Sequence, residues 1–199
     1  MKHSVKNLLL SLTLLSLPIL VAAEEIKIVA LGASQTAGKG VAESEAYPAQ
    51  LEKLLKAEGY SVSVANEGID GETTRQILDR MNRAVPDGTR IVILQPGTND
   101  KIRTKTRTAL TPEETRKNVE QMLVSLKARN INTILLGYPG EGGRGIAQEY
   151  SAVWYGQPNK DMTPEMFQTD GQHFTKAGYA VLAKNMSAVI QKILGKPQK

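Results

Sequence analysis

Short apolar segments alternate with amphipathic helical segments along most of this 199-residue chain. Four segments are short, apolar and rich in β-branched residues, which is typical of buried strands: 26–32, 60–68, 90–97 and 132–139. Four others place apolar residues at helical spacing: 46–60, 73–84, 111–130 and 175–194. Strands that alternate with helices through short connections predict a mostly parallel sheet covered on both faces. We therefore expect an α/β fold, a doubly wound α/β/α domain whose sheet has four to five strands.

The starts of three predicted helices carry capping residues. Thr73 precedes Gln76 by three residues, and Thr111 precedes Glu114 by the same spacing, which is the pattern of a capping box. Thr175 stands at the start of the last helical segment. These residues predict where the helices begin, and they place the preceding loops at the carboxyl ends of the strands, where ligands bind in such sheets.

Residues 1–23 have the pattern of a secretory signal peptide. Two lysines precede an apolar run at 8–21, and small residues end the segment at Ala23. The run is short for a membrane-spanning helix and is interrupted by serine and threonine, so we expect cleavage rather than a permanent anchor. The pattern predicts a periplasmic or secreted protein with one mature domain, residues 24–199, and no stable membrane span.

Composition narrows the chemistry that the mature chain can perform. The chain has no cysteine, which excludes disulfides, a thiol nucleophile and thiolate metal sites. Of its two histidines, His3 lies in the predicted signal peptide, so His173 would be the sole imidazole and no multi-histidine metal site can form. Loss of the two signal-peptide lysines lowers the net charge from +5 to about +3, too little to indicate nucleic-acid binding. We expect no metal or organic cofactor.

Ser34 follows the first predicted strand directly, in the stretch IKIVALGASQTAGKG. A serine at this place usually caps a helix or completes a turn, and the stretch lacks the Gly-x-Ser-x-Gly elbow. A second feature gives it another interpretation. Asp170 precedes His173 by three residues, and a carboxylate that holds an imidazole can make that imidazole the base that activates a serine. The alternative is that Asp170 and His173 form only a turn and a helix cap.

Acyl transfer also requires hydrogen-bond donors that face the developing oxyanion. Gly71, after the second strand, can present a backbone N–H where a side chain would obstruct a substrate. Asn99, after the third strand, offers a side-chain amide. Each also has an ordinary interpretation as a turn residue.

Four blocks of this sequence resemble the SGNH, or GDSL-type, hydrolases: Gly-Ala-Ser34-Gln, Gly71 in NEGIDGET, Asn99 in GTND, and DGQH at 170–173. The resemblance covers about the whole mature chain and is closest to small exported bacterial members with lysophospholipase, arylesterase and acyl-CoA thioesterase I activities. It implies a flavodoxin-like fold with Ser34 as nucleophile, His173 as general base and Asp170 as its partner. It further implies an oxyanion hole formed by the backbone N–H groups of Ser34 and Gly71 and the amide of Asn99.

The chain departs from the family pattern in two places. Ala33 and Gln35 replace the Asp and Leu that flank the serine in the namesake motif, and we expect this to alter loop support more than chemistry. Residues 140–169 contain no convincing fifth strand of the kind that precedes the Asp-x-x-His block in larger members. This segment therefore decides whether the sheet has four or five strands and how the acyl pocket is formed. The glycine-rich stretch GEGGRG, at 140–145, is expected to be a loop.

Two segments suggest how a substrate is bound. Lys101, Arg103, Lys105 and Arg107 follow Asn99 and can hold an anionic leaving group such as a lysophospholipid headgroup, or they form a solvated basic loop. A second segment gathers large apolar and aromatic residues: Tyr150, Trp154, Tyr155, Met162, Met166 and Phe167. It can form an apolar wall or lid beside the site, or simply pack on the sheet.

The sequence as a whole predicts an exported serine esterase that acts on a small-molecule or lipid ester through an acyl-enzyme on Ser34. Lysophospholipids and acyl thioesters are candidate substrates. A carbohydrate O-deacetylase would need the same residues, and a catalytically idle binding module that keeps the fold is the alternative outside enzymology.

Overall fold

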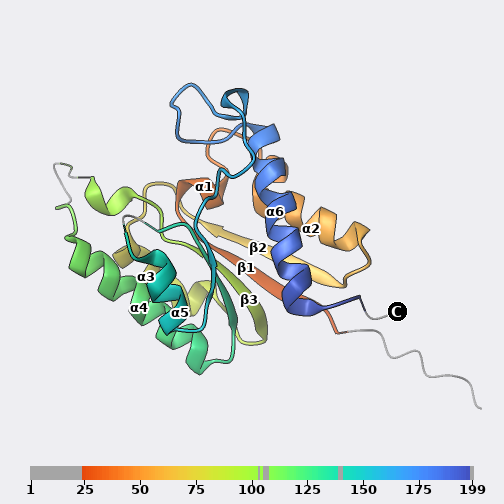
Figure 1. The fold of residues 1–199 in the computed structure, drawn as a ribbon, viewed down its shortest axis with the longest axis horizontal. Coiled ribbons are helices and arrows are strands. Elements are labelled where there is room, and N and C mark those ends of the chain that lie inside the picture. Colours follow the sequence, from red (N-terminus) through yellow and green to blue (C-terminus); the bar gives the residue numbers. More distant parts are fainter. Residues whose placement is uncertain (1–23, 103, 105–107, 139–140, 198–199) are drawn as a thin grey trace, which may run out of the picture.

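Five parallel strands form one sheet in the order β2-β1-β3-β4-β5, in a computed structural model that describes residues 24–102, 104, 108–138 and 141–197 (Figure 1). The strands are β1 (Ile26–Gly32), β2 (Val62–Gly68), β3 (Thr89–Gln95), β4 (Asn132–Leu136) and β5 (Val153–Tyr155). In the pairing register Gly32 lies opposite both Gly68 and Gln95. The carboxyl ends of the three strands β2, β1 and β3 therefore meet at one edge of the sheet.

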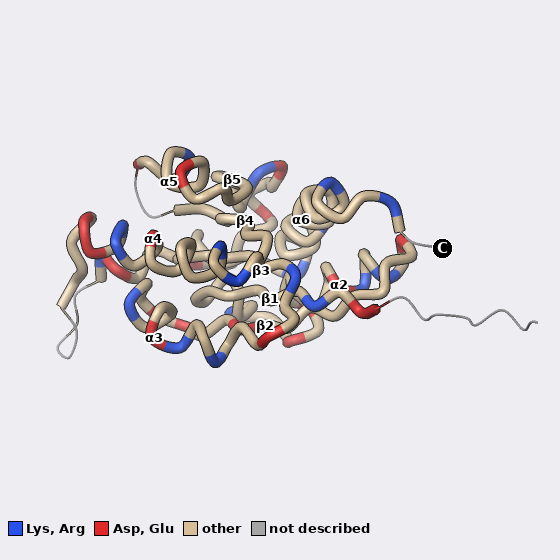
Figure 2. Tube along the Cα trace, turned by 90° about the horizontal axis from the view of Figure 1, so that it is seen from below, with Lys and Arg blue, Asp and Glu red and all other residues tan. Residues whose placement is uncertain are grey.

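Helices cover both faces of this sheet. The α-helices of the described residues are α1 (Ser34–Ala37), α2 (Tyr47–Ala57), α3 (Thr74–Ala84), α4 (Pro112–Ala128), α5 (Gly143–Glu149) and α6 (Lys176–Leu194), and all but α1, which lies across the strand ends, cover a face. Figure 2 shows the sheet almost edge-on, with α2 and α6 on one side and α3, α4 and α5 on the other. The predicted three-layer α/β/α fold with a parallel sheet is confirmed.

The strands β1, β3 and β4 are continuous apolar runs because helices bury both of their faces. Along β1, Ile28 and Ala30 enter the core under α2 and α6, whereas Val29 and Leu31 enter the core under α3 and α4. The same alternation continues in β3 and β4. A sheet buried on both faces cannot show the polar-apolar alternation of a half-exposed strand.

The predicted helix starts agree with the structure. The Thr73 side chain accepts a hydrogen bond from the Gln76 N–H, and the Gln76 side chain accepts one from the Thr73 N–H at 3.0 Å. The Thr111 N–H donates to the Glu114 carboxylate at 2.8 Å, and the Glu114 N–H returns a bond to the Thr111 hydroxyl at 3.1 Å. The Thr175 hydroxyl caps α6.

Residues 140–169 contain two regular elements that the sequence did not reveal. A fifth strand exists: β5 pairs in parallel with β4, with Val153 opposite Ile134. It is short and none of its residues is buried, so its sequence carries too little apolar pattern to be read as a strand. The glycine-rich segment expected to be a loop instead contains α5, whose Ile146 and Ala147 are buried in the core under α3 and α4. This packing outweighs the poor helix propensity of glycine.

Some sequence predictions fall on residues that the structure does not describe. The proposed signal peptide, residues 1–23, lies outside the described residues, as do Arg103, Lys105 and Arg107 of the basic segment. Within the described ranges, no helix has both the length and the apolar character needed to cross a bilayer.

The packing of α5 gives a first testable prediction. Ile146 is 1% exposed, and Ile146→Ala should lower the free energy of unfolding by about 2–5 kcal/mol because it leaves a cavity under α5. Val124, on the outer side of α4, is 51% exposed, and Val124→Ala should change it by less than about 1 kcal/mol. Urea unfolding of both variants checks this. Equal effects would mean that α5 does not pack as described.

Candidate active site

Ser34 is the first residue of α1, the short helix that follows β1 across a one-residue connection. Gly32 and Gly68 leave room for α1 to lie close to the strand ends. A Cβ on Gly32 would collide with the Thr36 side chain and the Gln95 carbonyl, and a Cβ on Gly68 would collide with the backbone of α1. The small ends of β1 and β2 thus let α1 lie directly across the edge of the sheet, which holds the Ser34 hydroxyl at the carboxyl end of β1.

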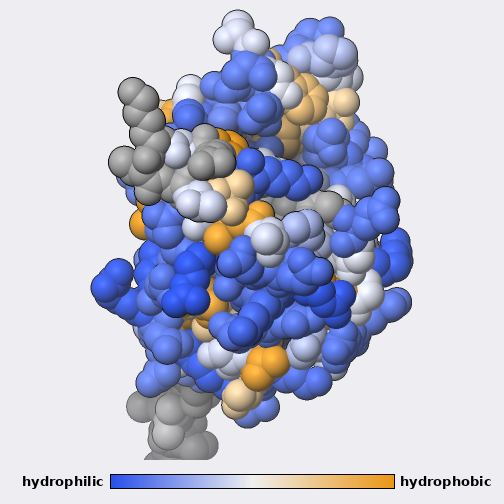
Figure 3. Space-filling model, turned by 90° about the vertical axis from the view of Figure 1, so that its left-hand side faces the viewer, coloured by the Kyte–Doolittle hydropathy of each residue, from blue (hydrophilic) through white to orange (hydrophobic). Residues whose placement is uncertain are grey.

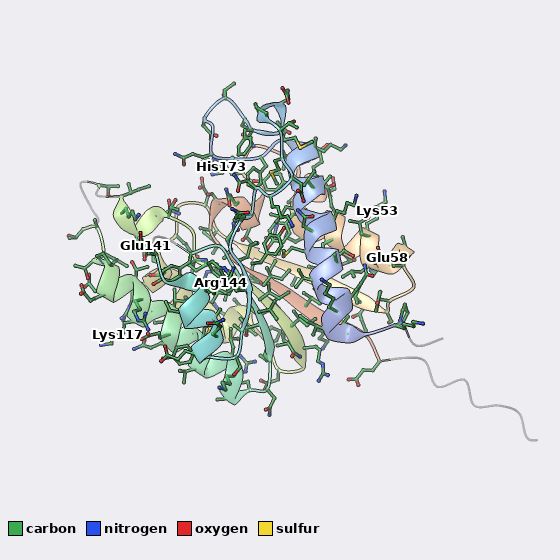
Figure 4. The ribbon with its side chains drawn as sticks, in the orientation of Figure 1. Lys53, Glu58, Lys117, Glu141, Arg144 and His173 are labelled. Atoms are coloured by element: carbon green, nitrogen blue, oxygen red, sulfur yellow. The ribbon has the colours of Figure 1, made fainter. Side chains whose placement is uncertain are left out.

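His173 lies beside this hydroxyl although 139 positions separate the two residues along the chain. Its Nε2 is 2.8 Å from Ser34 Oγ, and its Nδ1 is 2.6 Å from Asp170 Oδ2. The carboxylate can only accept, so Nδ1 carries the proton and Nε2 is left to accept from the serine hydroxyl. His173 is 8% exposed and lies close to α1 in Figure 4. The arrangement is that of a serine, a base and a carboxylate joined by hydrogen bonds.

Asp170 uses its two carboxylate oxygens differently. Oδ2 faces the imidazole, whereas Oδ1 accepts the backbone N–H groups of Gln172 and His173, each at 2.9 Å. The His173 side chain is the main cause that holds the pKa of Asp170 well below its usual range, and these two N–H groups add to it. The turn and the imidazole partner, considered as alternatives from sequence, are present together. Asp170 remains a carboxylate at neutral pH.

The loop that carries Asp170 and His173 is closed by aromatic residues. Phe167 and Phe174 form an isolated antiparallel bridge, and their rings meet edge-to-face with centroids 5.4 Å apart. Phe174 meets Tyr179 of α6 in the same way. This anchors both ends of the loop to the core beneath α6.

Asn99 and Gly71, the two other predicted oxyanion donors, line two neighbouring cavities. Asn99 begins a short 3₁₀ turn after β3, and its Nδ2 donates to the Glu72 carbonyl at 2.9 Å. Asn99 lines a cavity of about 630 Å³ together with Ser34 and His173. Gly71 instead lines an adjoining cavity of about 620 Å³, of which Asn99 is also a wall. A Cβ at Gly71 would meet no atom within 4 Å, so its side-chain position faces open space.

Apolar side chains form part of the walls of the cavity beside Ser34. Its apolar lining residues are Ala33, Ile102, Leu136, Tyr138, Pro158, Phe167 and Phe174. Of the aromatic and methionine residues singled out between 150 and 167, only Phe167 lines it. Tyr155 and Met162 pack against the core under α6, and Trp154 packs against the opposite core. Apart from Phe167, the aromatic and methionine residues of that segment therefore mainly pack against the two cores and do not line the cavity.

The two cavities share a polar rim. Lys39 and Asp70 line both and form an ion pair with N···O 3.0 Å. Ile102 also lines both and is 47% exposed. On the face drawn in Figure 3, apolar atoms form separate patches within a mostly hydrophilic surface.

Two buried charges that sequence analysis did not single out hold the segments around the site. Arg80 of α3 donates to Glu72 at 2.8 Å, to the Glu67 carbonyl at 2.8 Å and to the Gly32 carbonyl at 3.3 Å. It thereby ties the ends of β1 and β2 to the segment that follows Gly71. The signal in the sequence was an arginine next to Met81 on the inward side of an amphipathic helix.

Asp100 is the second buried charge, at 1% exposed. It accepts three hydrogen bonds: from the N–H and hydroxyl of Thr74, at 2.7 and 2.6 Å, and from the Thr115 hydroxyl at 2.7 Å. These bonds join the turn of Asn99 to the starts of α3 and α4. The sequence predicts only a turn after β3 and does not show that Asp100 is buried there.

Comparison with known proteins shows the family of this chain. Residues 30–181 match the GDSL-like Lipase/Acylhydrolase family. The chain belongs to this family. It is 28% identical over 184 residues to Esterase TesA of Pseudomonas aeruginosa, covering 84% of this chain and 89% of that protein. Family membership makes the chain a serine hydrolase of the esterase and acylhydrolase class.

Solved structures of similar proteins have the same fold. The SGNH-hydrolase family esterase AlinE4 is 28% identical with a TM-score of 0.65, covering 87% of this chain and 98% of that one. The psychrotrophic esterase EstA from Pseudoalteromonas sp. has a TM-score of 0.72 at 20% identity, covering 86% of this chain and all of that one. The SGNH hydrolase fold predicted from sequence is confirmed. The roles of individual residues stay predictions.

Arg80 provides a stability test. Arg80→Met should lower the free energy of unfolding by about 3 kcal/mol, because it leaves the largely buried Glu72 carboxylate without its cation. The exposed Arg75–Asp79 pair of the same helix is a matched control, and Arg75→Met should cost less than about 1 kcal/mol. Urea unfolding measures both. If Arg80→Met costs no more than its control, the Arg80 clamp does not contribute to stability.

The lowered pKa of Asp170 gives a pH prediction. A depressed folded-state pKa stabilises the fold above the unfolded pKa, about 3.9 for aspartate, and this contribution is lost as pH falls through the lower folded value. The stability margin of wild type over Asp170→Asn should be largest above about pH 5 and should shrink below about pH 4. Urea unfolding of both proteins at pH values above about 5 and below about 4 measures this margin. Asp87→Asn, at an exposed aspartate, is the control. A margin that grows on acidification would contradict the assignment.

Proposed function

We propose that this chain is an exported esterase that hydrolyses carboxylic esters through an acyl-enzyme on Ser34. The observation that carries the proposal is the unbroken hydrogen-bonded series from Ser34 Oγ to His173 Nε2 at 2.8 Å and from His173 Nδ1 to Asp170 at 2.6 Å. It opens on a cavity at the carboxyl ends of the strands. Membership of a lipase and acylhydrolase family supports the same reaction.

The reaction follows from this geometry in two halves. His173 Nε2 takes the proton of the Ser34 hydroxyl as Oγ attacks the ester carbonyl, and Asp170 stabilises the imidazolium that forms. When the tetrahedral intermediate collapses, the imidazolium gives its proton to the departing alkoxide, and the acyl group remains on Ser34. Water then attacks the acyl-enzyme with His173 again as base, which releases the carboxylic acid and restores the serine.

The negative oxygen of each tetrahedral intermediate needs donors that are already in place. We assign these to the backbone N–H groups of Ser34 and Gly71 and to the amide of Asn99. The Glu72 carbonyl orients the Asn99 amide, and Arg80 holds the Glu72 side chain. The Asn99 amide is therefore fixed by hydrogen bonds before a substrate binds. Loss of one such donor typically costs about 10²–10³ in kcat.

The walls of the cavity favour an acyl chain longer than acetyl. Apolar side chains such as Leu136, Pro158 and Phe167 face the space beside Ser34. Each methylene that enters an apolar pocket contributes about 0.8 kcal/mol, roughly a fourfold gain in kcat/KM. Lysophospholipids and acyl thioesters fit this substrate class. The N-terminal signal pattern supports a periplasmic or secreted location, so the substrate would be met outside the cytoplasm.

The direct test is hydrolysis of p-nitrophenyl esters from acetate to palmitate by the chain beginning at Glu24. We expect kcat/KM to rise with acyl length before it levels off, because the cavity walls are apolar. Ser34→Ala and His173→Ala should each lower turnover at least about a thousandfold. Val124→Ala serves as the unaffected control.

The other outcomes decide against this proposal in distinct ways. Activity confined to the acetate ester would identify an O-deacetylase instead. Absence of turnover, together with failure of an alkyl phosphonate to label wild type, would identify a catalytically idle binding protein. The phosphonate is a reasonable probe because the similar esterase EstA has been crystallised inhibited by monoethylphosphonate. Labelling of wild type but not of Ser34→Ala would support Ser34 as the nucleophile.

A further inference from the structure

Gln35, the residue directly after Ser34, connects three parts of the site. Its Nε2 donates to the carbonyl of Gln172 at 3.1 Å, and its Oε1 accepts from Gln95 Nε2 at 2.5 Å. Gln95 in turn accepts from the Thr36 hydroxyl at 2.6 Å. The namesake motif of the family has leucine at the position of Gln35, and a leucine could form neither bond. The replacement of that leucine by Gln35 therefore adds two hydrogen bonds next to the site.

The bond to Gln172 acts on the peptide group that precedes His173. The Gln172 carbonyl and the His173 N–H belong to one planar peptide group. Its N–H donates to Asp170 Oδ1 at 2.9 Å, and its carbonyl accepts from Gln35. The plane is thus held at both edges. Because the Cα of His173 follows directly, the orientation of this plane sets the direction in which the imidazole leaves the backbone.

Gln95 determines which end of the Gln35 amide faces the histidine loop. Gln95 lies at the carboxyl end of the central strand β3 and is 4% exposed, so its position is fixed by the sheet. The Thr36 hydroxyl donates to its Oε1, which leaves its Nε2 directed at Gln35. The oxygen of Gln35 must face that donor, and its NH₂ group therefore faces the Gln172 carbonyl.

A second glutamine ties the same loop to the segment just after α1 and makes no bond to the peptide before His173. Gln168 Nε2 donates to the carbonyls of Lys39 and Phe174, each at 2.7 Å. Its backbone N–H donates to the His173 carbonyl at 2.8 Å. Gln168 thus positions the loop that carries His173, whereas Gln35 bonds to the Gln172–His173 peptide that directs the imidazole.

We propose that Gln35, oriented by Gln95, is a positioning residue that fixes the Gln172–His173 peptide and so aligns the imidazole with Ser34. The inference rests on the proposed function of His173 as the base. A misplacement of about 1 Å at a reacting group can cost about a hundredfold in rate, so a bond at this place has a measurable effect.

Gln35→Met is the test variant, since it removes the donor and the acceptor at similar side-chain length. We expect kcat on p-nitrophenyl butyrate to fall about 10- to 100-fold, with KM changed less than about twofold, because the bond aligns the base and does not hold substrate. Gln95→Met should act in the same direction. The double variant should be no slower than the slower single one, because both act through one contact. Gln121→Met, on the exposed side of α4, is the matched control.

A spectroscopic readout separates positioning from general destabilisation. In the chain that begins at Glu24 and carries no histidine tag, His173 is the sole imidazole, so ring NMR signals need no assignment. The Nδ1 proton signal of the hydrogen-bonded ring should shift or broaden in Gln35→Met, whereas thermal unfolding should show a folded protein. If Gln35→Met does not fold, the same signal is followed in Gln95→Met.

Three results would overturn the inference. They are a kcat of Gln35→Met within twofold of wild type, an unchanged ring signal, and a rise in KM alone, which would assign Gln35 to substrate binding. Failure of the proposed function is distinguishable, since a wild type without esterase activity would still report the order of its His173 ring by NMR.

Discussion

The parallel register of β2, β1 and β3 is the constraint on which the rest of the site depends. It brings Gly32, Gly68 and Gln95 side by side at one edge of the sheet. Two of these three positions carry no side chain, so α1 can lie across the strand ends with its first residue, Ser34, facing out. The third carries an amide that is buried and points along the same edge. The sheet therefore supplies both the space for the serine turn and the first polar anchor beside it.

Buried polar side chains then connect loops that the sheet alone does not order. Arg80 joins the ends of β1 and β2 to the Glu72 segment, and Asp100 joins the turn of Asn99 to α3 and α4. A buried polar or charged group is costly when unpaired, so each such group favours the one loop arrangement that satisfies it. This gives the site a defined geometry although its residues come from four different connections.

Sequence patterns predicted most of the fold and of the candidate site, and the failures have physical causes. Long, strongly patterned segments and their caps, such as Thr73 with Gln76, were read correctly because local chemistry decides them. β5 was missed because three residues are too few to show a strand pattern, although Val, Trp and Tyr favour strands. α5 was missed because tertiary packing outweighs the poor helix propensity of its glycines. Arg80 and the partners of Gln35 were missed because a lone polar residue in a sequence does not say which distant carbonyl it will meet.

The geometry of Asp170 shows that a turn and a contact with the imidazole, which the sequence presents as alternatives, occur together. Its side chain is 46% exposed, so little desolvation opposes its ionised form. Local backbone N–H groups and the imidazole favour the carboxylate instead, which keeps it charged without the cost of a buried ion. One oxygen shapes the turn and the other receives the ring proton. The turn thus fixes the direction in which the carboxylate faces His173, and the same bonds that order the loop orient the imidazole.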